Sequence, residues 1–154
     1  MTIYLVAFFL GVVAGLRSMT VPAAVAWAAR LGVLNVAGTA VSFLGNSWVP
    51  WLFSVLAVGE LVTDQLPATP SRKTPIPFGA RIVVGLLAGW VVCISGGNTL
   101  AGAAAGGVGA VAGTLGGAAA RGKLAAAFGR DRPAALVEDF VAIGTAVLLM
   151  ATRS

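Results

Sequence analysis

The chain has 154 residues, of which 58% are hydrophobic and only 10% charged, and its formal net charge is +5. Soluble domains carry about 25% charged residues, so a soluble fold of this size would leave too much apolar surface in water. The mean hydropathy of +0.96 therefore indicates an integral membrane protein, and the sequence predicts a single transmembrane domain over residues 1–154.

The missing residue types narrow the possible functions. The chain has no histidine, and its one cysteine, Cys93, lies in an apolar run. The usual general base, the commonest metal ligand and a disulfide framework are therefore absent, and no cofactor is expected. The positive charge fits loops that orient the chain and contact membrane lipids, so no nucleic-acid partner is expected.

The first apolar segment leads into an interrupted one. Residues 1–16 carry no charge. We interpret them as a retained span, because no basic region precedes them and equally apolar segments follow. The sequence GLRSMTVP (15–22) then predicts a helix that stops near Arg17 and restarts, with Ser18 or Thr20 capping the second piece. A plain loop between two short helices is the alternative.

Residues 31–48 are too polar for a span and predict a short interfacial or re-entrant helix. Trp48, Pro50 and Trp51 are typical of an interfacial anchor that opens a span of about 50–66. The proline-rich residues 67–77 predict an ordered loop, since each proline disfavours helix at the residue before it.

Two carboxylates lie near the end of the span over 50–66. Glu60 and Asp64 are four residues apart, so they share one helical face. A charge inside a bilayer is costly unless it is paired or hydrated, so this pair is a hypothesis for a functional site. The alternative is a helix end at the membrane surface, with hydrated carboxylates and with Arg72 and Arg81 binding head groups.

Residues 82–120 carry no charge and are long enough for two membrane crossings, with the turn at 95–98. The second crossing, 100–120, is almost entirely glycine and alanine. Its glycines recur at helical spacing and predict a glycine zipper, a close contact between helix backbones within one chain or between copies in a homo-oligomer. The zipper glycines are Gly102, Gly106, Gly109, Gly113 and Gly117.

A basic loop over 121–132 precedes a last span of about 133–152. Glu138 and Asp139 lie in that span, and adjacent positions are about 100° apart on a helix, so at most one is expected to point straight into a bundle. Placement at a helix N-terminus would explain both residues through the helix dipole. Their depth favours a functional or pairing role instead.

The spans together predict an all-α, multi-pass bundle of about five main spans, with a broken or re-entrant segment near 17–45. Seven of the ten Lys and Arg residues then lie on one side, in the loops 67–81 and 121–132. That side is expected to be the cytoplasm and the C-terminus to lie outside, whereas the orientation of the N-terminus stays open.

Four blocks resemble a family of small bacterial integral membrane proteins described only as a domain of unknown function. They are GLRSMTVPAAVAWAARLG (15–32), ELVTDQLPATPSR (60–72), GAVAGTLGG (109–117) and ALVEDFVAIG (135–144). The resemblance implies a multi-pass helical protein of the bacterial inner membrane and no particular activity. Gln65 departs from the family's pattern, which has a basic residue at this place.

Transport is the stronger functional hypothesis. Intramembrane carboxylates, arginines near span ends and an interrupted helix are typical of substrate and proton pathways. The carboxylates would carry a proton or a small cation, and the helix start at Arg17, Ser18 and Thr20 would receive an anionic group. Arg72, Arg81 and Arg121 are further candidates for binding the ion or substrate. We expect Glu60 or Asp64 to contact Glu138, Asp139 or one of three arginines. These arginines are Arg17, Arg81 and Arg121.

Two other classes are weaker. A metal-dependent enzyme could hold Mg²⁺ on the four carboxylates and act on a lipid phosphate, but no known catalytic signature accompanies them. A structural or assembly protein could use the glycine zipper as its interface, and the carboxylates would then be dispensable.

Overall fold

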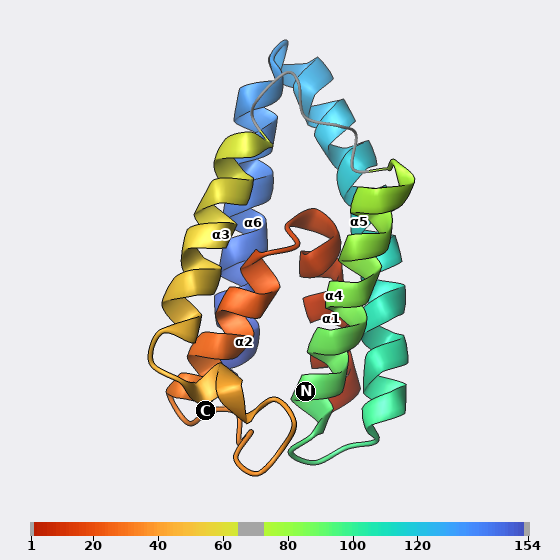
Figure 1. Cartoon of the computed structure of the whole chain (residues 1–154). Coiled ribbons are helices and arrows are strands. Elements are labelled where there is room, and N and C mark those ends of the chain that lie inside the picture. The colour runs from red at the N-terminus through yellow and green to blue at the C-terminus, as the bar shows by residue number, and fades with distance from the viewer. Residues whose placement is uncertain (1, 65–72, 153–154) are drawn as a thin grey trace.

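The computed structural model describes residues 2–64 and 73–152, so Gln65 and Arg72 lie outside the described residues. The described part is all-helical, as predicted, and contains no strand (Figure 1). Its elements are α1 (Ile3–Leu16), α2 (Thr20–Arg30), the short 3₁₀ helix η1 (Ser42–Gly45), α3 (Val49–Thr63), α4 (Pro75–Cys93), α5 (Thr99–Phe128) and α6 (Asp131–Ala151).

Three of the described helices, α4, α5 and α6, are long and apolar enough to cross a membrane. Helices α1 and α3 are apolar but have only 14 and 15 residues. At 1.5 Å per residue each measures about 21–23 Å, less than the roughly 30 Å of a hydrocarbon layer. The helical class is confirmed, and so are candidate membrane spans, but not five of them.

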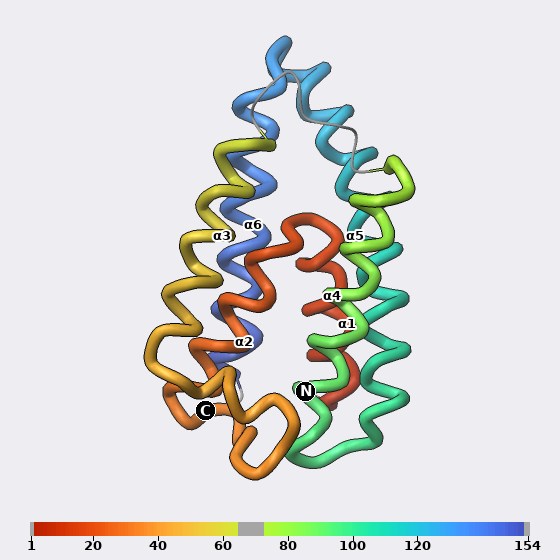
Figure 2. The backbone as a smooth tube through the Cα atoms, in the orientation of Figure 1, coloured from red at the N-terminus to blue at the C-terminus, as the bar shows by residue number. Residues whose placement is uncertain are grey.

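Helices α1 and α2 form a hairpin whose reversal lies inside the molecule. The chain path in Figure 2 runs inward along α1, turns at residues 17–19 and returns along α2 to the end where it began. The predicted stop and restart is therefore confirmed. The predicted cap is wrong: α2 begins after Met19, and no local side chain caps it.

The predicted helix over 31–48 is also wrong. This segment contains turns and only the one short 3₁₀ helix, η1. Gly32 and Gly38 have φ of 79° and 72°, a left-handed conformation that glycine adopts without steric cost. These glycines and the polar residues between them favour turns over helix.

The predicted basic loop over 121–132 is mostly helix. Helix α5 continues to Phe128, so Arg121 and Lys123 lie on its last turns. Alanine, leucine, lysine and arginine are all strong helix formers, and charge alone does not end a helix. The helix ends at Gly129, whose φ of 66° is the usual left-handed C-terminal conformation, and α6 starts at Asp131.

Helix α5 packs against both α1 and α4 through its glycines. A Cβ added at Gly106 would overlap the backbone of Gly85 on α4, and one at Gly113 would overlap the carbonyl of Val12 on α1. Gly102 lies in the same way against Gly89 of α4, Gly109 lies against Phe8 of α1, and Gly117 is buried. These glycines are therefore used within one chain and are not available for a contact between copies.

Candidate functional site

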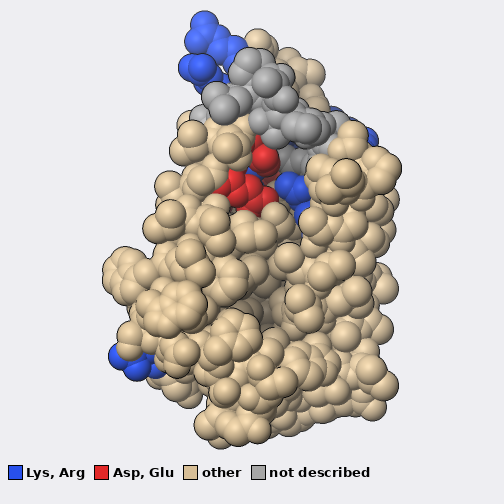
Figure 3. Space-filling view, in the orientation of Figure 1, with Lys and Arg blue, Asp and Glu red and all other residues tan. Residues whose placement is uncertain are grey.

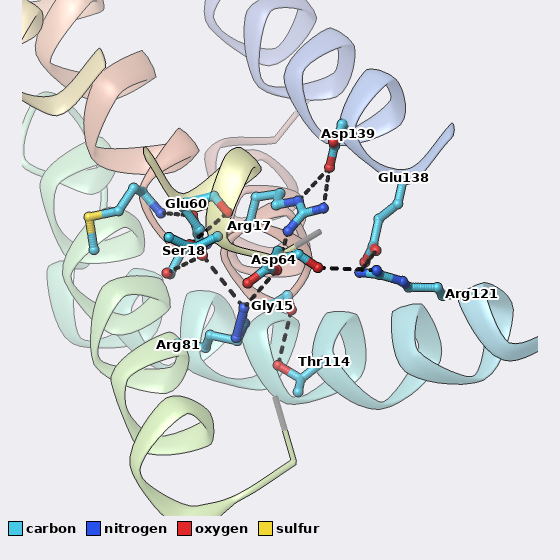
Figure 4. Close-up of polar contacts among 12 residues, drawn as sticks. Gly15, Arg17, Ser18, Glu60, Asp64, Arg81, Thr114, Arg121, Glu138 and Asp139 are labelled. Atoms are coloured by element: carbon cyan, nitrogen blue, oxygen red, sulfur yellow. Dashed lines mark hydrogen bonds and ion pairs between the residues drawn. The ribbon is translucent and has the colours of Figure 1, made fainter. Parts of the chain in front are cut away.

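All five acidic residues of the chain make ion pairs with three arginines. Figure 4 shows four of these acids, Glu60, Asp64, Glu138 and Asp139, around the reversal of the hairpin. The acids come from α3, its end, and α6, and the arginines come from the hairpin, α4 and α5. This charge network consists of Glu60, Asp64, Asp131, Glu138, Asp139, Arg17, Arg81 and Arg121. Residues that are up to 122 positions apart in the sequence, such as Arg17 and Asp139, therefore lie in one cluster.

Arg17 is at the centre of the network and is fully buried. Its Nε donates a hydrogen bond of 2.6 Å to Oδ1 of Asp139 on α6, and its Nη1 donates to Oδ2 of Asp64 at the end of α3. One guanidinium therefore joins the reversal of the hairpin to two other helices. The expected meeting of Asp64 with an arginine and, through that arginine, with Asp139 is present in the structure.

Glu60 caps α2 from another helix. Its Oε1 accepts hydrogen bonds from the backbone N–H of Ser18 at 2.9 Å and from the Ser18 hydroxyl at 2.6 Å. Its Oε2 accepts a bond of 2.8 Å from the backbone N–H of Met19. A carboxylate at a helix N-terminus is favoured by the helix dipole, so Glu60 supplies the cap that the sequence assigned to Ser18 or Thr20.

The other two arginines extend the network to both sides. Arg81 on α4 is buried, with its Nη2 3.5 Å from Oε1 of Glu60 and 3.9 Å from Oδ2 of Asp64. Arg121 on α5 donates to both carboxylate oxygens of Asp131 at 2.9 and 2.6 Å. Its Nη2 also donates to the carbonyl of Asp64 at 3.3 Å, so every helix that brings a charge is tied to a second one.

The adjacent residues Glu138 and Asp139 are both buried, each with 7% exposure. Asp139 contacts Arg17, whereas Oε2 of Glu138 lies 3.5 Å from Nη1 of Arg121. The two directions differ because the side chains leave the helix about 100° apart. Both acids are therefore buried and paired with an arginine. The expectation that at most one would point into the bundle gave too few buried acids.

Thr114 is a contributor that sequence reasoning missed. Its buried hydroxyl lies 2.8 Å from the carbonyl of Ala110 and 3.3 Å from the carbonyl of Gly15, two residues before Arg17. It therefore steadies the end of α1 where the hairpin reverses. The available signal was a single hydroxyl residue within the glycine stretch 109–117.

The buried centre of the network lies away from both ends of α4 and α6, whereas Asp131 is the first residue of α6. Arg81 is six residues from the start of α4 and twelve from its end, about 9 and 18 Å along the axis. Asp139 is similarly placed about 12 and 18 Å from the ends of α6. Within a hydrocarbon layer of roughly 30 Å these charges would be costly if they were not paired.

Cavities also lie between the described helices. One, of about 260 Å³, lies between α2, η1, α3 and α4 and has almost entirely apolar walls. A second, of about 230 Å³, lies between α2, α3 and α6 and includes Thr20. The third, of about 240 Å³, lies between α5 and α6 and includes Arg121 and Glu138.

The carboxylates point toward arginines and do not form a common ligand set. Within residues 2–64 and 73–152, no group of three His, Cys, Asp or Glu side chains is placed to hold a metal ion. The hypothesis of Mg²⁺ on the four carboxylates therefore gains no support from the described geometry.

Comparisons with protein-family models, with curated proteins and with solved structures find no match to this chain. The resemblance of the four sequence blocks to a bacterial membrane family therefore stays a prediction.

Proposed function

We propose that this protein is a small multi-pass transporter or channel-like protein of the bacterial inner membrane, and that the reversal of the α1–α2 hairpin is its gate. The observation that carries the proposal is the position of Arg17. A fully buried cation at an interrupted helix is held by one carboxylate from the end of α3 and another from α6.

This arrangement fits transport because each carboxylate can be neutralised separately. A proton or a small cation on Asp139 would weaken the tie between Arg17 and α6, and the same event on Asp64 would weaken the tie to the end of α3. The hairpin would then favour a different position. Interrupted helices with paired charges are the usual sites of ion and substrate passage in transporters.

Glu60 changes the role expected for the start of α2. Three hydrogen bonds from Ser18 and Met19 already place a carboxylate at this helix N-terminus. An anionic substrate would have to displace Glu60 there. We therefore place the ion-dependent step at the two carboxylates of Arg17, and an anionic substrate remains the second form of the proposal.

The proposed topology has α3, α4, α5 and α6 crossing the membrane and the α1–α2 hairpin entering and leaving from one side. In Figure 1 the turn between α5 and α6 lies at one end of the molecule, and the N-terminus lies at the other. A reporter inserted at Gly129 should be cytoplasmic, whereas reporters before Met1 and after Ser154 should be external. Finding Gly129 and Ser154 on the same side would overturn this topology.

The test of function is ion flux in liposomes containing the purified protein, followed for protons, sodium, potassium and chloride. We expect Asp64→Asn and Asp139→Asn to lower flux by about tenfold or more while the fold is kept. The matched control is Asp131→Asn, because the side chain of Asp131 is 60% exposed and does not contact Arg17. Wild-type flux in both buried variants would refute the proposal.

A further inference from the structure

The cavity between α5 and α6, here called the α5–α6 cavity, contains two members of the charge network. Among the described residues that line it, Glu138 is the one carboxylate and Arg121 the one cation, and the others are glycine, alanine, leucine and valine. Its volume of about 240 Å³ is ample for water molecules, each of which takes about 30 Å³ in the liquid. The two charged side chains give such water the polar partners that it needs.

The cavity begins near the end of α5 that leads into α6. Leu124, at this end of the cavity, is four residues before Phe128, about 6 Å along the axis. Gly116 lines the cavity further along α5 and is exposed, so the cavity borders the molecular surface. In the proposed topology the turn between α5 and α6 faces the cytoplasm, and water would enter the cavity from that side.

Only one of the two adjacent acids of α6 lines this cavity. Glu138 and Asp139 are equally buried, at 7% exposure each. In Figure 4 the side chain of Glu138 points toward Arg121 on α5, whereas that of Asp139 points toward Arg17. An ion that enters between α5 and α6 therefore meets Glu138 before it meets the carboxylates of Arg17.

The network also comes to the surface on another face. The space-filling view shows acidic and basic atoms side by side between α3 and α4 (Figure 3). Glu60, the network's carboxylate within α3, already accepts three hydrogen bonds from Ser18 and Met19. An ion at Glu60 would have to compete with these bonds, so the α5–α6 cavity is the more favourable entrance.

The charge balance of the network favours uptake of positive charge. Its ion pairs join five carboxylates to three guanidiniums, so negative charge is in excess among the described members when all are ionised. Arg121 is shared, because it donates to Asp131 at 2.9 and 2.6 Å and lies 3.5 Å from Oε2 of Glu138. The charged groups around Glu138 are Arg121 on α5, Arg17 in the hairpin, Asp131 and Asp139 on α6, and Asp64 at the end of α3.

A proton suits the α5–α6 cavity better than sodium or potassium does. A metal cation needs several oxygen ligands, and residues 2–64 and 73–152 contain no group of three acidic, His or Cys side chains placed to supply them. In the cavity a metal would have the single carboxylate of Glu138, beside a guanidinium that repels it. A proton needs only one carboxylate oxygen.

We propose that a proton reaches the charge network through the α5–α6 cavity and binds first at Glu138. The inference rests on the proposed function, whose ion and point of entry it names. The proton converts the carboxylate of Glu138 to a neutral carboxyl group. This ends the ion pair with Arg121 and removes the negative charge beside Asp139.

The experiment measures the rate at which dicyclohexylcarbodiimide modifies each carboxyl group of the detergent-purified protein, by mass spectrometry of its peptides. This apolar reagent reacts with protonated carboxyl groups. We expect Glu138 to react about tenfold faster than Asp139, its equally buried neighbour outside the cavity. The rate at Glu138 should rise as the pH is lowered, by up to about tenfold per unit, because the protonated fraction rises.

The ion is tested by replacing choline chloride with sodium chloride in the same assay. A sodium ion bound at Glu138 would protect the carboxylate from the reagent. We expect no protection, because the proposed ligand is a proton.

The route is tested by filling the cavity after the protein has folded. Gly116→Cys provides a site for a bulky maleimide, since an added Cβ there meets nothing within 4 Å and the native Cys93 is buried. The adduct should slow the reaction of Glu138 by about tenfold. Gly122→Cys is the matched control, because its Cβ also meets nothing within 4 Å and Gly122 does not line the cavity. Its adduct should leave the rate unchanged.

Each outcome bears on one part of the proposal. Equal rates at Glu138 and Asp139, or no reaction at Glu138, would overturn Glu138 as the first acceptor. Protection by sodium would overturn the proton, and equal effects of the two maleimide adducts would overturn the route. Ion flux is not measured here, so these failures leave the proposed function standing, whereas absence of flux in liposomes would overturn that function without changing these rates.

Discussion

Helices α1, α4 and α5 are held together by a different means from α3 and its neighbours. In the first group glycines bring backbones into direct contact, as at Gly106 against Gly85. Helix α3 has only Val49 and Pro50 buried along its length, both at its first turn. Its other end is held by Glu60 and Asp64, through hydrogen bonds and ion pairs.

The difference suggests which part is fixed and which part can move. Close packing of backbones depends on no charge state, and it is the main source of helix association in lipid. Ion pairs change when a proton or an ion arrives. The glycine-packed group is therefore suited to be the scaffold, and the end of α3 with the hairpin is suited to be the switch.

The strongest test of the scaffold is Gly113→Leu. Even a Cβ at this position would overlap the carbonyl of Val12, so a leucine must separate α5 from α1. We expect loss of the folded protein, measured as monodisperse material on size exclusion in detergent.

Gly116→Leu is the matched control, because Gly116 lies on the same helix and a Cβ there meets nothing within 4 Å. It should behave as the wild type does. Similar yields and elution for the two variants would show that the glycine contacts do not hold the scaffold.

The fold could be predicted where apolar runs decide it. The charge-free runs gave α4, the first part of α5 and most of α6, since a span needs a long apolar helix and little else. They predict that the second crossing ends near residue 120, whereas α5 continues to Phe128, because charged residues alone do not end a helix. They also cannot tell which face of a span is buried: Val92 lies in such a run and is fully buried, because burial depends on how α1 and α5 pack against α4.

The sequence predicts that the buried acids need partners, but it does not predict which residues those partners are. The cost of burying a charge indicates that Asp64 needs a partner, whatever the fold. That the partner is Arg17 follows only from the reversal of the hairpin, which brings residue 17 beside residues 64 and 139. Capping rules concern residues next to the helix start in the sequence, so they predict Ser18 as the cap. They cannot predict Glu60, which lies about 40 residues further along the chain.

The second largest effect is expected from Arg17→Gln, at the switch. It leaves Asp64 and Asp139 buried without their shared cation, which typically costs about 3–5 kcal/mol. The measurement is the denaturation midpoint in detergent.

The triple variant that adds Asp64→Asn and Asp139→Asn removes the stranded charges and should regain much of this loss. If the triple variant is as unstable as Arg17→Gln alone, the loss comes from packing and not from charge.

A smaller effect is expected from Ser18→Ala. It removes the hydroxyl that donates to Glu60 at 2.6 Å but leaves the two backbone donors in place. A hydrogen bond to a charged group contributes about 1.5–3 kcal/mol, and partial compensation by the remaining donors should bring the loss in free energy of unfolding to about 1 kcal/mol. Ser42→Ala, at an exposed position in η1, is the control and should have no measurable effect. If Ser18→Ala also had no measurable effect, the cap on α2 would depend on the two backbone donors alone.

The smallest effect is expected from Asp131→Asn, at the outer edge of the charge network. Asp131 makes two hydrogen bonds to Arg121, but its side chain is 60% exposed, and exposed ion pairs usually contribute less than about 1 kcal/mol. Glu138→Gln removes a second carboxylate near the same arginine, and the side chain of Glu138 is only 6% exposed. We expect the variant at 138 to lower the denaturation midpoint clearly more than the variant at 131, and only the effect at 131 to diminish at high salt. A larger loss of stability for Asp131→Asn than for Glu138→Gln would mean that the exposed ion pair stabilises the protein more than the buried one. Buried charge would then not be what holds α3.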